Sequence, residues 1–290
     1  MNKELIISKY PEFSESIFVV NNYGWTNDVL IADEHIIFRF PKNSESAENL
    51  KKEMFFLPKL KNLLSINIPD FKYFSEDSGS IFCGYEMIKG IFLEKDIFES
   101  LPHDEKISLC NEIGIFLSEL HSFPENILKN YFGEDSSELQ FLKLKNELIK
   151  KAGFLFSEKE IKKIHIFFDS FINLMKKSNY KSSLIHGDLS SDHILYKNKR
   201  LSGVIDFGDM NYSDPAYDFT GLFLCFGEKY FKYILNFYSG ITDDNFNERI
   251  KKFYIPKIPI HSILYGLEIN DTDLVKNSCK NFRITLENII

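Results

Sequence analysis

The spacing of apolar residues changes near residue 88 of this 290-residue chain. Before that point, short apolar runs separated by turn residues predict an antiparallel sheet, with strands over 18–20, 29–32, 36–40 and 81–88. After it, apolar residues recur every three to four positions. This spacing predicts helices over about 104–121, 137–151 and 158–177, and three to five more within 217–290. We therefore expect an α+β fold with a sheet-rich part at 1–88 and a mostly helical part at 89–290.

Two apolar, β-prone runs each deliver an aspartate to a turn of small residues. Residues 184–187 lead to Asp188, and residues 204–205 lead to Asp206. Phosphoryl transfer requires one carboxylate near the attacking hydroxyl and further ligands that hold Mg²⁺ on the nucleotide phosphates. Asp188 suits the first task and Asp206 the second.

His193 follows Asp188 by five residues, where protein kinases carry the asparagine of their catalytic loop. Its ring nitrogen could bind the same metal, although magnesium prefers oxygen ligands. The alternative is that both aspartates only cap turns after buried strands. The order Asp, His, Asp-Phe-Gly favours the catalytic interpretation.

A strand and the helix after it each place a charged residue on an apolar face. Arg39 lies within an apolar strand, and Glu53 falls on the apolar face of the next predicted helix. A buried charge requires a partner or an anion, so the pattern predicts an ion pair that holds a phosphate-binding cation. Lys42 is a competing cation, and a solvated Arg39 with an exposed Glu53 is the alternative. Pro58 predicts that this helix ends or kinks near Met54.

Two segments of the sheet-rich part are candidates for nucleotide contacts. Gly24 lies in a turn that could cover phosphates, although an ordinary hairpin turn explains this glycine-poor segment equally well. Residues 85–91 are expected to form a hinge. There the backbone groups of Glu86 and Ile88 would bind the purine edge, and Tyr85 would close the back of the pocket.

Charge and composition exclude several classes of function. A net charge of −7 and a pI near 5.6 argue against a nucleic-acid-binding surface. They suit a cationic partner, or simply solubility. The chain has no apolar run typical of a signal peptide and none approaching the roughly 20 residues of a membrane span. With four widely spaced cysteines, we expect reduced thiols in a soluble, cytoplasmic monomer that binds no membrane.

Three motifs together resemble the aminoglycoside phosphotransferases: Ile-His-Gly-Asp-x4-His-Ile, Ile-Asp-Phe-Gly-Asp and Asp-Pro-x2-Asp-Phe. Segments 38–42, 117–121 and 189–195 look most like the 2″-phosphotransferase branch. The resemblance spans about residues 15 to 270. It implies a two-lobed fold like that of eukaryotic protein kinases, with a small antiparallel-sheet N-lobe at 1–88 and a helical C-lobe at 89–290. It also implies inactivation of an antibiotic in the bacterial cytoplasm.

The resemblance assigns roles to residues by their positions in these motifs. Asp188 would be the base or the carboxylate that positions the acceptor, Ser190 a neighbour of the transferred phosphate, and His193 with Asp206 the Mg²⁺ ligands. Arg39 stands where the family has a phosphate-contacting lysine.

The nucleotide would be GTP or ATP. A bulky residue at the position of Tyr85 implies that GTP is preferred, because a large ring would obstruct adenine bound in its usual deep register.

The acceptor is less clearly specified than the reaction. In the 2″ branch, the helix after the Asp-Pro-x2-Asp-Phe motif carries acidic residues that bind the drug's ammonium groups, whereas here residues 222–227 carry none and Glu228 follows. Asp188, Asp192 and Glu268 are the other candidate carboxylates. A kinase for another antibiotic, choline, homoserine or a sugar stays open as an alternative, as does a nucleotide-binding module without catalysis.

Overall fold

The computed structural model describes residues 2–21, 26–77 and 81–289, and the chain divides into two compact units. Unit 1 comprises Met1–Phe123, His186–Asn211 and Gly221–Gly240, and unit 2 comprises Pro124–Ile185, Tyr212–Thr220 and Ile241–Ile290. Each unit is thus assembled from three separate stretches of chain. The predicted lobe boundary near residue 88 stays a prediction.

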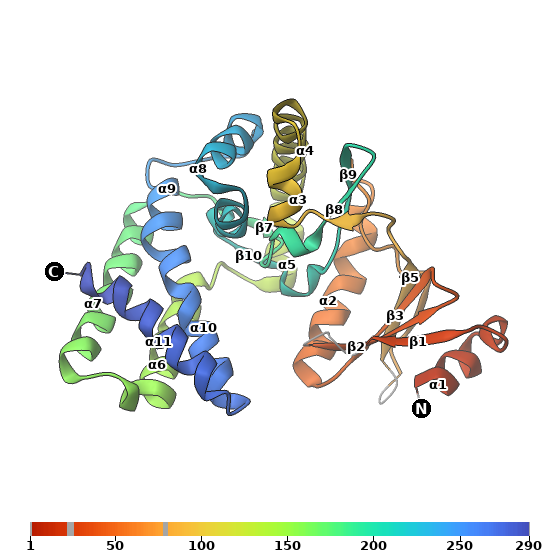
Figure 1. The fold of residues 1–290 in the computed structure, drawn as a ribbon, viewed down its shortest axis with the longest axis horizontal. Helices are drawn as coiled ribbons and strands as arrows, with labels where there is room; N and C mark the ends of the chain where they lie inside the picture. Colours follow the sequence, from red (N-terminus) through yellow and green to blue (C-terminus); the bar gives the residue numbers. More distant parts are fainter. Residues whose placement is uncertain (1, 22–25, 78–80, 290) are drawn as a thin grey trace. The chain divides into compact units, whose positions relative to one another are not determined.

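A five-stranded antiparallel sheet with the order β1-β2-β3-β5-β4 dominates the N-terminal part of unit 1 (Figure 1). Its strands are β1 (Phe18–Asn21), β2 (Asn27–Ala32), β3 (Ile36–Pro41), β4 (Tyr73–Ser75) and β5 (Phe82–Glu86). The predicted meander and the strand after it are confirmed.

Alternate residues of each strand point to opposite faces of the sheet. One face carries Phe38 and Phe82, which pack in a buried cluster with Ile6 of α1 (Asn2–Lys9) and Phe13 of the 3₁₀ turn η1 (Pro11–Phe13). The sequence pattern did not predict α1. On the opposite face, β3 and β5 present polar side chains that contribute to the candidate site.

Helix α2 (Ser44–Leu60) follows β3 and begins at Asn43, whose side chain accepts a hydrogen bond from the Ser46 N–H at 2.8 Å. The helix continues through Pro58, so the predicted end near Met54 is wrong, and the alternative of a kink there stays a prediction. Pro58 lies in the last turn, where its missing N–H removes a single backbone hydrogen bond.

The rest of unit 1 combines a small sheet with three helices. The sheet has the order β6-β8-β9, with strands β6 (Ile91–Phe92), β8 (Ile194–Lys197) and β9 (Arg200–Val204). The helices are α3 (Lys95–Ser100), α4 (His103–His121) and α8 (Phe219–Phe237), and the first two residues of α8 belong to unit 2. The prediction of a helix over about 104–121 is confirmed by α4. A non-helical Gly227 divides α8 into two segments.

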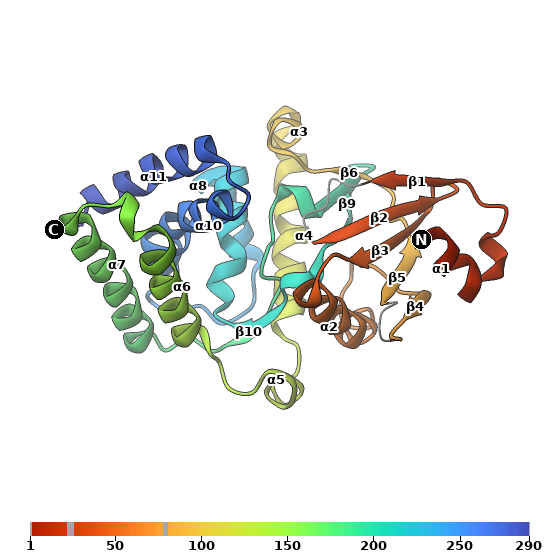
Figure 2. The same ribbon diagram turned by 90° about the horizontal axis from the view of Figure 1, so that it is seen from below.

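Unit 2 consists mainly of helices, and α6, α7, α10 and α11 pack together as a group (Figures 1 and 2). Their bounds are Ser137–Ala152, Glu158–Lys177, Ile255–Glu268 and Thr272–Glu287. The shorter elements are α5 (Glu125–Phe132), η2 (Gly153–Leu155), η5 (Pro215–Asp218), α9 (Phe246–Arg249), the π-turn η6 (Ile250–Tyr254) and the strand pair β7 (Ser183–Ile185) and β10 (Asn211–Ser213). The helices predicted over 137–151 and 158–177 are confirmed.

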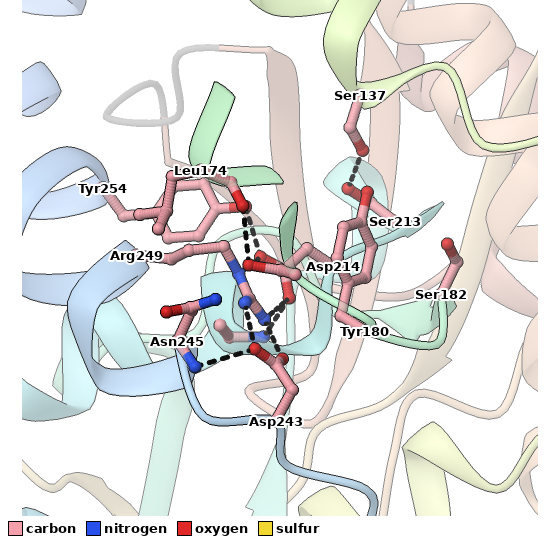
Figure 3. A network of polar contacts seen from close by, with 12 residues as sticks. Ser137, Leu174, Tyr180, Ser182, Ser213, Asp214, Asp243, Asn245, Arg249 and Tyr254 are labelled. Atoms are coloured by element: carbon pink, nitrogen blue, oxygen red, sulfur yellow. Dashed lines mark hydrogen bonds and ion pairs between the residues drawn. The ribbon is translucent and has the colours of Figure 1, made fainter. Parts of the chain in front are cut away.

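Unit 2 contains a buried ionic network (Figure 3). The Arg249 guanidinium donates to both carboxylate oxygens of Asp214, at 2.5 and 3.0 Å, and to both of Asp243, at 2.8 and 2.7 Å. The Tyr254 hydroxyl also donates to Asp214, at 2.7 Å. Burial would raise the pKa of Asp243, but the hydrogen bonds from Arg249 leave it below its ordinary value.

In the described ranges of the chain, no helix is both long and apolar enough to cross a membrane.

Candidate active site

The segment His186–His193, here called the 186–193 loop, lies against the turn that follows β9. The buried His186 ring bonds to the Ile205 carbonyl through Nε2 at 3.0 Å and accepts the Asp188 N–H at Nδ1 at 3.3 Å. Since a carbonyl oxygen only accepts, Nε2 carries the proton and Nδ1 is free to accept. The neutral ring therefore links the backbone of Asp188 to the strand end that carries Asp206.

Gly187 allows close contact between the 186–193 loop and the 3₁₀ turn η4 (Phe207–Asp209). Its φ is +85°, which L side chains rarely adopt, and a Cβ atom there would lie 2.1 Å from the Asp209 carbonyl oxygen. A larger residue would therefore push the loop away from the turn.

His193 lies between Asp188 and Asp206, and one of its two ring nitrogens is available to bind a ligand. Nδ1 lies 2.6 Å from the Asp188 carbonyl oxygen and must donate to it. Nε2 is consequently unprotonated in the neutral ring, and it lies 3.7 Å from the Asp206 carboxylate. The lone pair of His193 Nε2 and the carboxylate of Asp206 thus face each other, and both could bind the same divalent cation.

Asp206 has a left-handed backbone conformation, with φ +63° and ψ +65°. Aspartate tolerates this region better than most residues, and the turn directs the carboxylate toward both His193 and Arg39. The Arg39 Nη2 atom lies 3.4 Å from Asp206 Oδ1. Asp206 therefore connects the 186–193 loop to the large sheet.

The expected ion pair between Arg39 and Glu53 is present, with Nη1 and Oε2 separated by 2.8 Å and both side chains buried. Burial raises the pKa of Glu53 and the Arg39 guanidinium opposes this effect, so the charge-assisted contact favours the ionised pair. Glu53 Oε1 has no hydrogen-bond partner among residues 2–21, 26–77 and 81–289. Lys42, the competing cation, lies 3.7 Å from Asp28 instead.

The Asp188 carboxylate lies in a strongly acidic environment. Desolvation by the surrounding atoms raises its pKa to about 6, His193 opposes this shift, and Asp209, Asp206 and Asp192 add to it by repulsion. The side chain is 57% exposed, so water screens part of this repulsion. The concentration of carboxylates around Asp188 favours a cation at this place.

Ser190 and Asp192 belong to the same 186–193 loop. The Ser190 carbonyl accepts the His193 N–H at 3.1 Å, and the exposed Asp192 carboxylate accepts from the Ser191 hydroxyl at 3.1 Å. Both lie within four residues of Asp188, but their contacts with phosphate or acceptor stay predictions.

The three predicted nucleotide-binding residues at the end of β5 differ in exposure. Tyr85 is buried on the sheet face that carries Arg39, with its ring 5.7 Å from that of Phe71. Glu86 exposes its side chain and pairs with Lys72 at 2.6 Å.

The Met87 N–H bonds to the His35 carbonyl, and bonded pairs alternate along an antiparallel ladder. The backbone groups of Glu86 therefore face away from β3, and their contact with a purine stays a prediction. The Ile88 side chain lies over Gly203 of β9, which joins this segment to the strand before Asp206.

The remaining predicted site residues are Gly24, Glu228 and Glu268. Gly24 lies outside the described residues. Glu228 is exposed after the break in α8 and pairs with Lys232 at 3.4 Å. Glu268 is exposed at the end of α10 in unit 2. Their roles in binding stay predictions.

Sequence reasoning assigned no role to three residues that shape the site. His186 orients the 186–193 loop, and its place two residues before Asp188 was the available signal. The carboxylate of Asp209 and the ammonium of Lys52 attract each other: burial lowers the pKa of Lys52, and the charge of Asp209 opposes that shift. Asp209 ends the Ile-Asp-Phe-Gly-Asp motif, which was the available signal for it, whereas no local pattern distinguishes Lys52 from an ordinary surface charge.

Comparisons with known proteins agree with this geometry. The model of the phosphotransferase enzyme family matches residues 19–255. A solved GDP and kanamycin complex of APH(2″)-IIia has a TM-score of 0.87 and 27% identity, covering 99% of this chain and 98% of that chain. For the gentamicin complex of APH(2″)-IIa the TM-score is 0.82 and the identity 25%, covering 96% of this chain and 94% of that one.

A curated relative, the uncharacterized protein YcbJ of Bacillus subtilis (strain 168), is 45% identical over 58 residues. That stretch is 20% of this chain and only 19% of the relative. The structural likeness confirms the kinase-like α+β fold and the resemblance to aminoglycoside 2″-phosphotransferases that the sequence motifs indicated. Because the family model covers most of its length, this chain belongs to the phosphotransferase enzyme family.

Proposed function

We propose that this phosphotransferase transfers the γ-phosphate of a nucleoside triphosphate to a hydroxyl group of an aminoglycoside, at the 2″ position. The observation that carries the proposal is the placement of Asp188 and Asp206 on either side of His193, within reach of the Arg39–Glu53 pair. A carboxylate for the acceptor, a donor pair for a cation and a buried guanidinium for phosphate are thus present together.

Asp188 would accept a hydrogen bond from the acceptor hydroxyl and hold its oxygen in line with the γ-phosphorus. The proton of the hydroxyl would pass to Asp188 as the new oxygen–phosphorus bond forms. The bond between the γ-phosphorus and the bridging oxygen would break in the same step, and the nucleoside diphosphate would leave with that oxygen. Arg39, fixed by Glu53, would offset charge on the phosphate oxygens. The protein's contribution is therefore positioning and electrostatic stabilisation around one proton transfer.

Asp206 and His193 would hold Mg²⁺, the cofactor that the reaction class requires. No group of three or more His, Cys, Asp or Glu side chains in the described parts of the chain is arranged as a metal site. Two protein ligands still fit, because Mg²⁺ completes its shell with phosphate oxygens and water. When bound, the ion would neutralise charge that develops on the phosphates.

The aminoglycoside acceptor is supported by charge and by similarity. Asp192, Asp206 and Asp209 lie close enough to Asp188 to raise its pKa by repulsion, and the whole chain carries a net charge of −7. A polycationic acceptor would be attracted to such a surface. The two solved APH(2″) structures hold kanamycin and gentamicin.

A direct test is mass spectrometry of kanamycin or gentamicin after incubation with the protein, GTP and Mg²⁺. One phosphoryl group adds roughly 80 Da, and fragmentation assigns it to a ring. The matched control is the Asp188→Asn variant under the same conditions. Absence of the adduct with both drugs would overturn the proposal that the acceptor is an aminoglycoside. If the protein still bound the nucleotide, the proposal of a kinase acting on another acceptor would remain.

A second candidate is the same reaction on a less cationic acceptor. The first segment of α8 carries Leu224, with 47% of its surface exposed, where the 2″ branch has acidic residues. Glu228, the nearest acidic residue along this helix, already pairs with Lys232. A panel of macrolides, choline, homoserine and sugars, assayed with labelled GTP and ATP, separates this candidate from the first.

We predict that GTP is the preferred donor and that Tyr85→Ala improves the use of ATP. Removing the buried ring opens the back of the pocket, so the ratio of kcat/KM for ATP to that for GTP should rise about tenfold. Steady-state kinetics with both nucleotides measures the ratio. Phe74→Ala, on the exposed surface of β4, is the control and should leave it unchanged. Equal use of both nucleotides by the wild type, together with no gain in Tyr85→Ala, would contradict the prediction.

A further inference from the structure

The first turns of α8 lie directly against the backbone of the 186–193 loop. A Cβ atom on Gly221 would lie 2.2 Å from the Leu189 carbonyl oxygen and 3.3 Å from the Ser190 Cα atom. One helical turn later, the Cys225 thiol donates to the Ser191 hydroxyl at 3.3 Å. Two residues spaced by four thus contact three consecutive residues of the loop.

Gly221 is required by this contact and not by its own backbone conformation. Alanine has a higher helix propensity than glycine, so replacing Gly221 by alanine would stabilise α8 if the helix were isolated. The close approach of the Leu189 carbonyl explains why position 221 has no side chain. A backbone carbonyl cannot move aside as the end of a flexible side chain can. Two residues of the loop itself, His186 and Gly187, contact the segment after β9, at the Ile205 carbonyl and at Asp209.

We propose that Gly221 is a positioning residue for phosphoryl transfer, with Cys225 completing the surface on which the 186–193 loop rests. Leu189 follows Asp188 directly, and its side chain is buried. A shift of the Leu189 carbonyl is therefore transmitted through one peptide unit to the Asp188 carboxylate. The proposal rests on the proposed function only for its effect on rate, because the contact itself is independent of the acceptor.

The test is the Gly221→Ala variant, assayed for transfer and for hydrogen exchange in the loop. We expect kcat to fall about 10- to 100-fold, since displacing a reacting group by about 1 Å has effects of this size. The nucleotide KM should stay within about twofold, because Arg39 and the β5 segment are untouched. Backbone amides of residues 187–192 should exchange faster than in the wild type.

Gly114→Ala is the matched control. A Cβ atom on Gly114, in α4, would lie 2.7 Å from the Ile234 carbonyl oxygen and 2.8 Å from the Phe237 Cβ atom. This substitution is equally crowded, but it presses on the far end of α8. Gly114→Ala should lower the melting temperature as much as Gly221→Ala does. Its kcat and the hydrogen exchange of the 186–193 loop should equal those of the wild type.

Equal losses of kcat in the two glycine variants would overturn the proposal, as would unchanged kcat and exchange in Gly221→Ala. If Gly221→Ala does not fold, Cys225→Leu replaces it, because the larger side chain presses on Ser191 from a half-buried site. It should show the same selective fall in kcat, and a normal kcat would count against the proposal. If the wild type transfers phosphate to no acceptor, the proposed function fails, and loop exchange alone decides the role of Gly221.

Discussion

Asp188→Asn is expected to lower kcat for phosphoryl transfer by about 10²- to 10⁴-fold, the usual contribution of general-base assistance. Asparagine matches the size of aspartate and can still contact the acceptor hydroxyl, but it cannot take up the proton. The backbone contacts that orient Asp188, through His186 and His193, do not involve its carboxylate. The nucleotide KM should therefore change little.

Steady-state kinetics with an accepted aminoglycoside, together with nucleotide titration, tests this result. Asp104→Asn, an exposed aspartate in the first turn of α4, is the control and should keep wild-type rates. Full activity in Asp188→Asn would remove Asp188 from the base role. A large rise in nucleotide KM with little change in kcat would instead indicate that its charge serves to hold the nucleotide.

The sheet, the helices and the Arg39–Glu53 pair could be predicted from sequence because each follows from a local pattern. Strand and helix periodicities differ, so the apolar spacing separated β1, β2, β3 and β5 from α4, α6 and α7. The three-residue strand β4 was not predicted. Arg39 and Glu53 stood out because a charge on an apolar face requires a partner. Asp188 and Asp206 were found because each ends an apolar run.

Features that depend on contacts distant in sequence could not be predicted. The direction of the Asp206 carboxylate depends on a left-handed backbone conformation, for which aspartate is permitted but not required. Gly221 reads as an ordinary helix glycine until the Leu189 carbonyl is placed beside it. The end of α2 was predicted too early, because the destabilisation caused by Pro58 depends on how many helical turns follow it, and α2 ends two residues later.

Arg249 illustrates the same limit on a larger scale. Within a helical stretch it resembles a surface residue, and its partner Asp214 lies 35 residues earlier. The structure shows it fully buried, with Asp243 as its second partner. The Asp-Pro pair at 214–215, noted in the sequence only as part of a family motif, thus lies in the buried interior of unit 2.

Arg249→Leu is expected to destabilise the protein by about 3–5 kcal/mol, because it leaves two buried carboxylates, Asp214 and Asp243, without their cation. For a unit of this size the melting temperature should fall on the order of 10 °C. Thermal unfolding followed by circular dichroism measures the shift. Arg200→Leu is the control, since Arg200 is 77% exposed and its pair with Glu112 should contribute little.

The pH dependence of stability shows whether Arg249→Leu loses stability through the missing ion pairs or through poorer packing. In the wild type the pKa of Asp243 is lowered, so its stabilising contribution is present above its unfolded pKa and is lost as the pH falls through the folded value. In Arg249→Leu the unpaired carboxylates should have raised pKa values and gain protons on mild acidification. The stability difference between the two proteins should therefore shrink as the pH is lowered from neutral toward the carboxylate range. A difference that is constant with pH would instead attribute the loss to the cavity left by the arginine side chain.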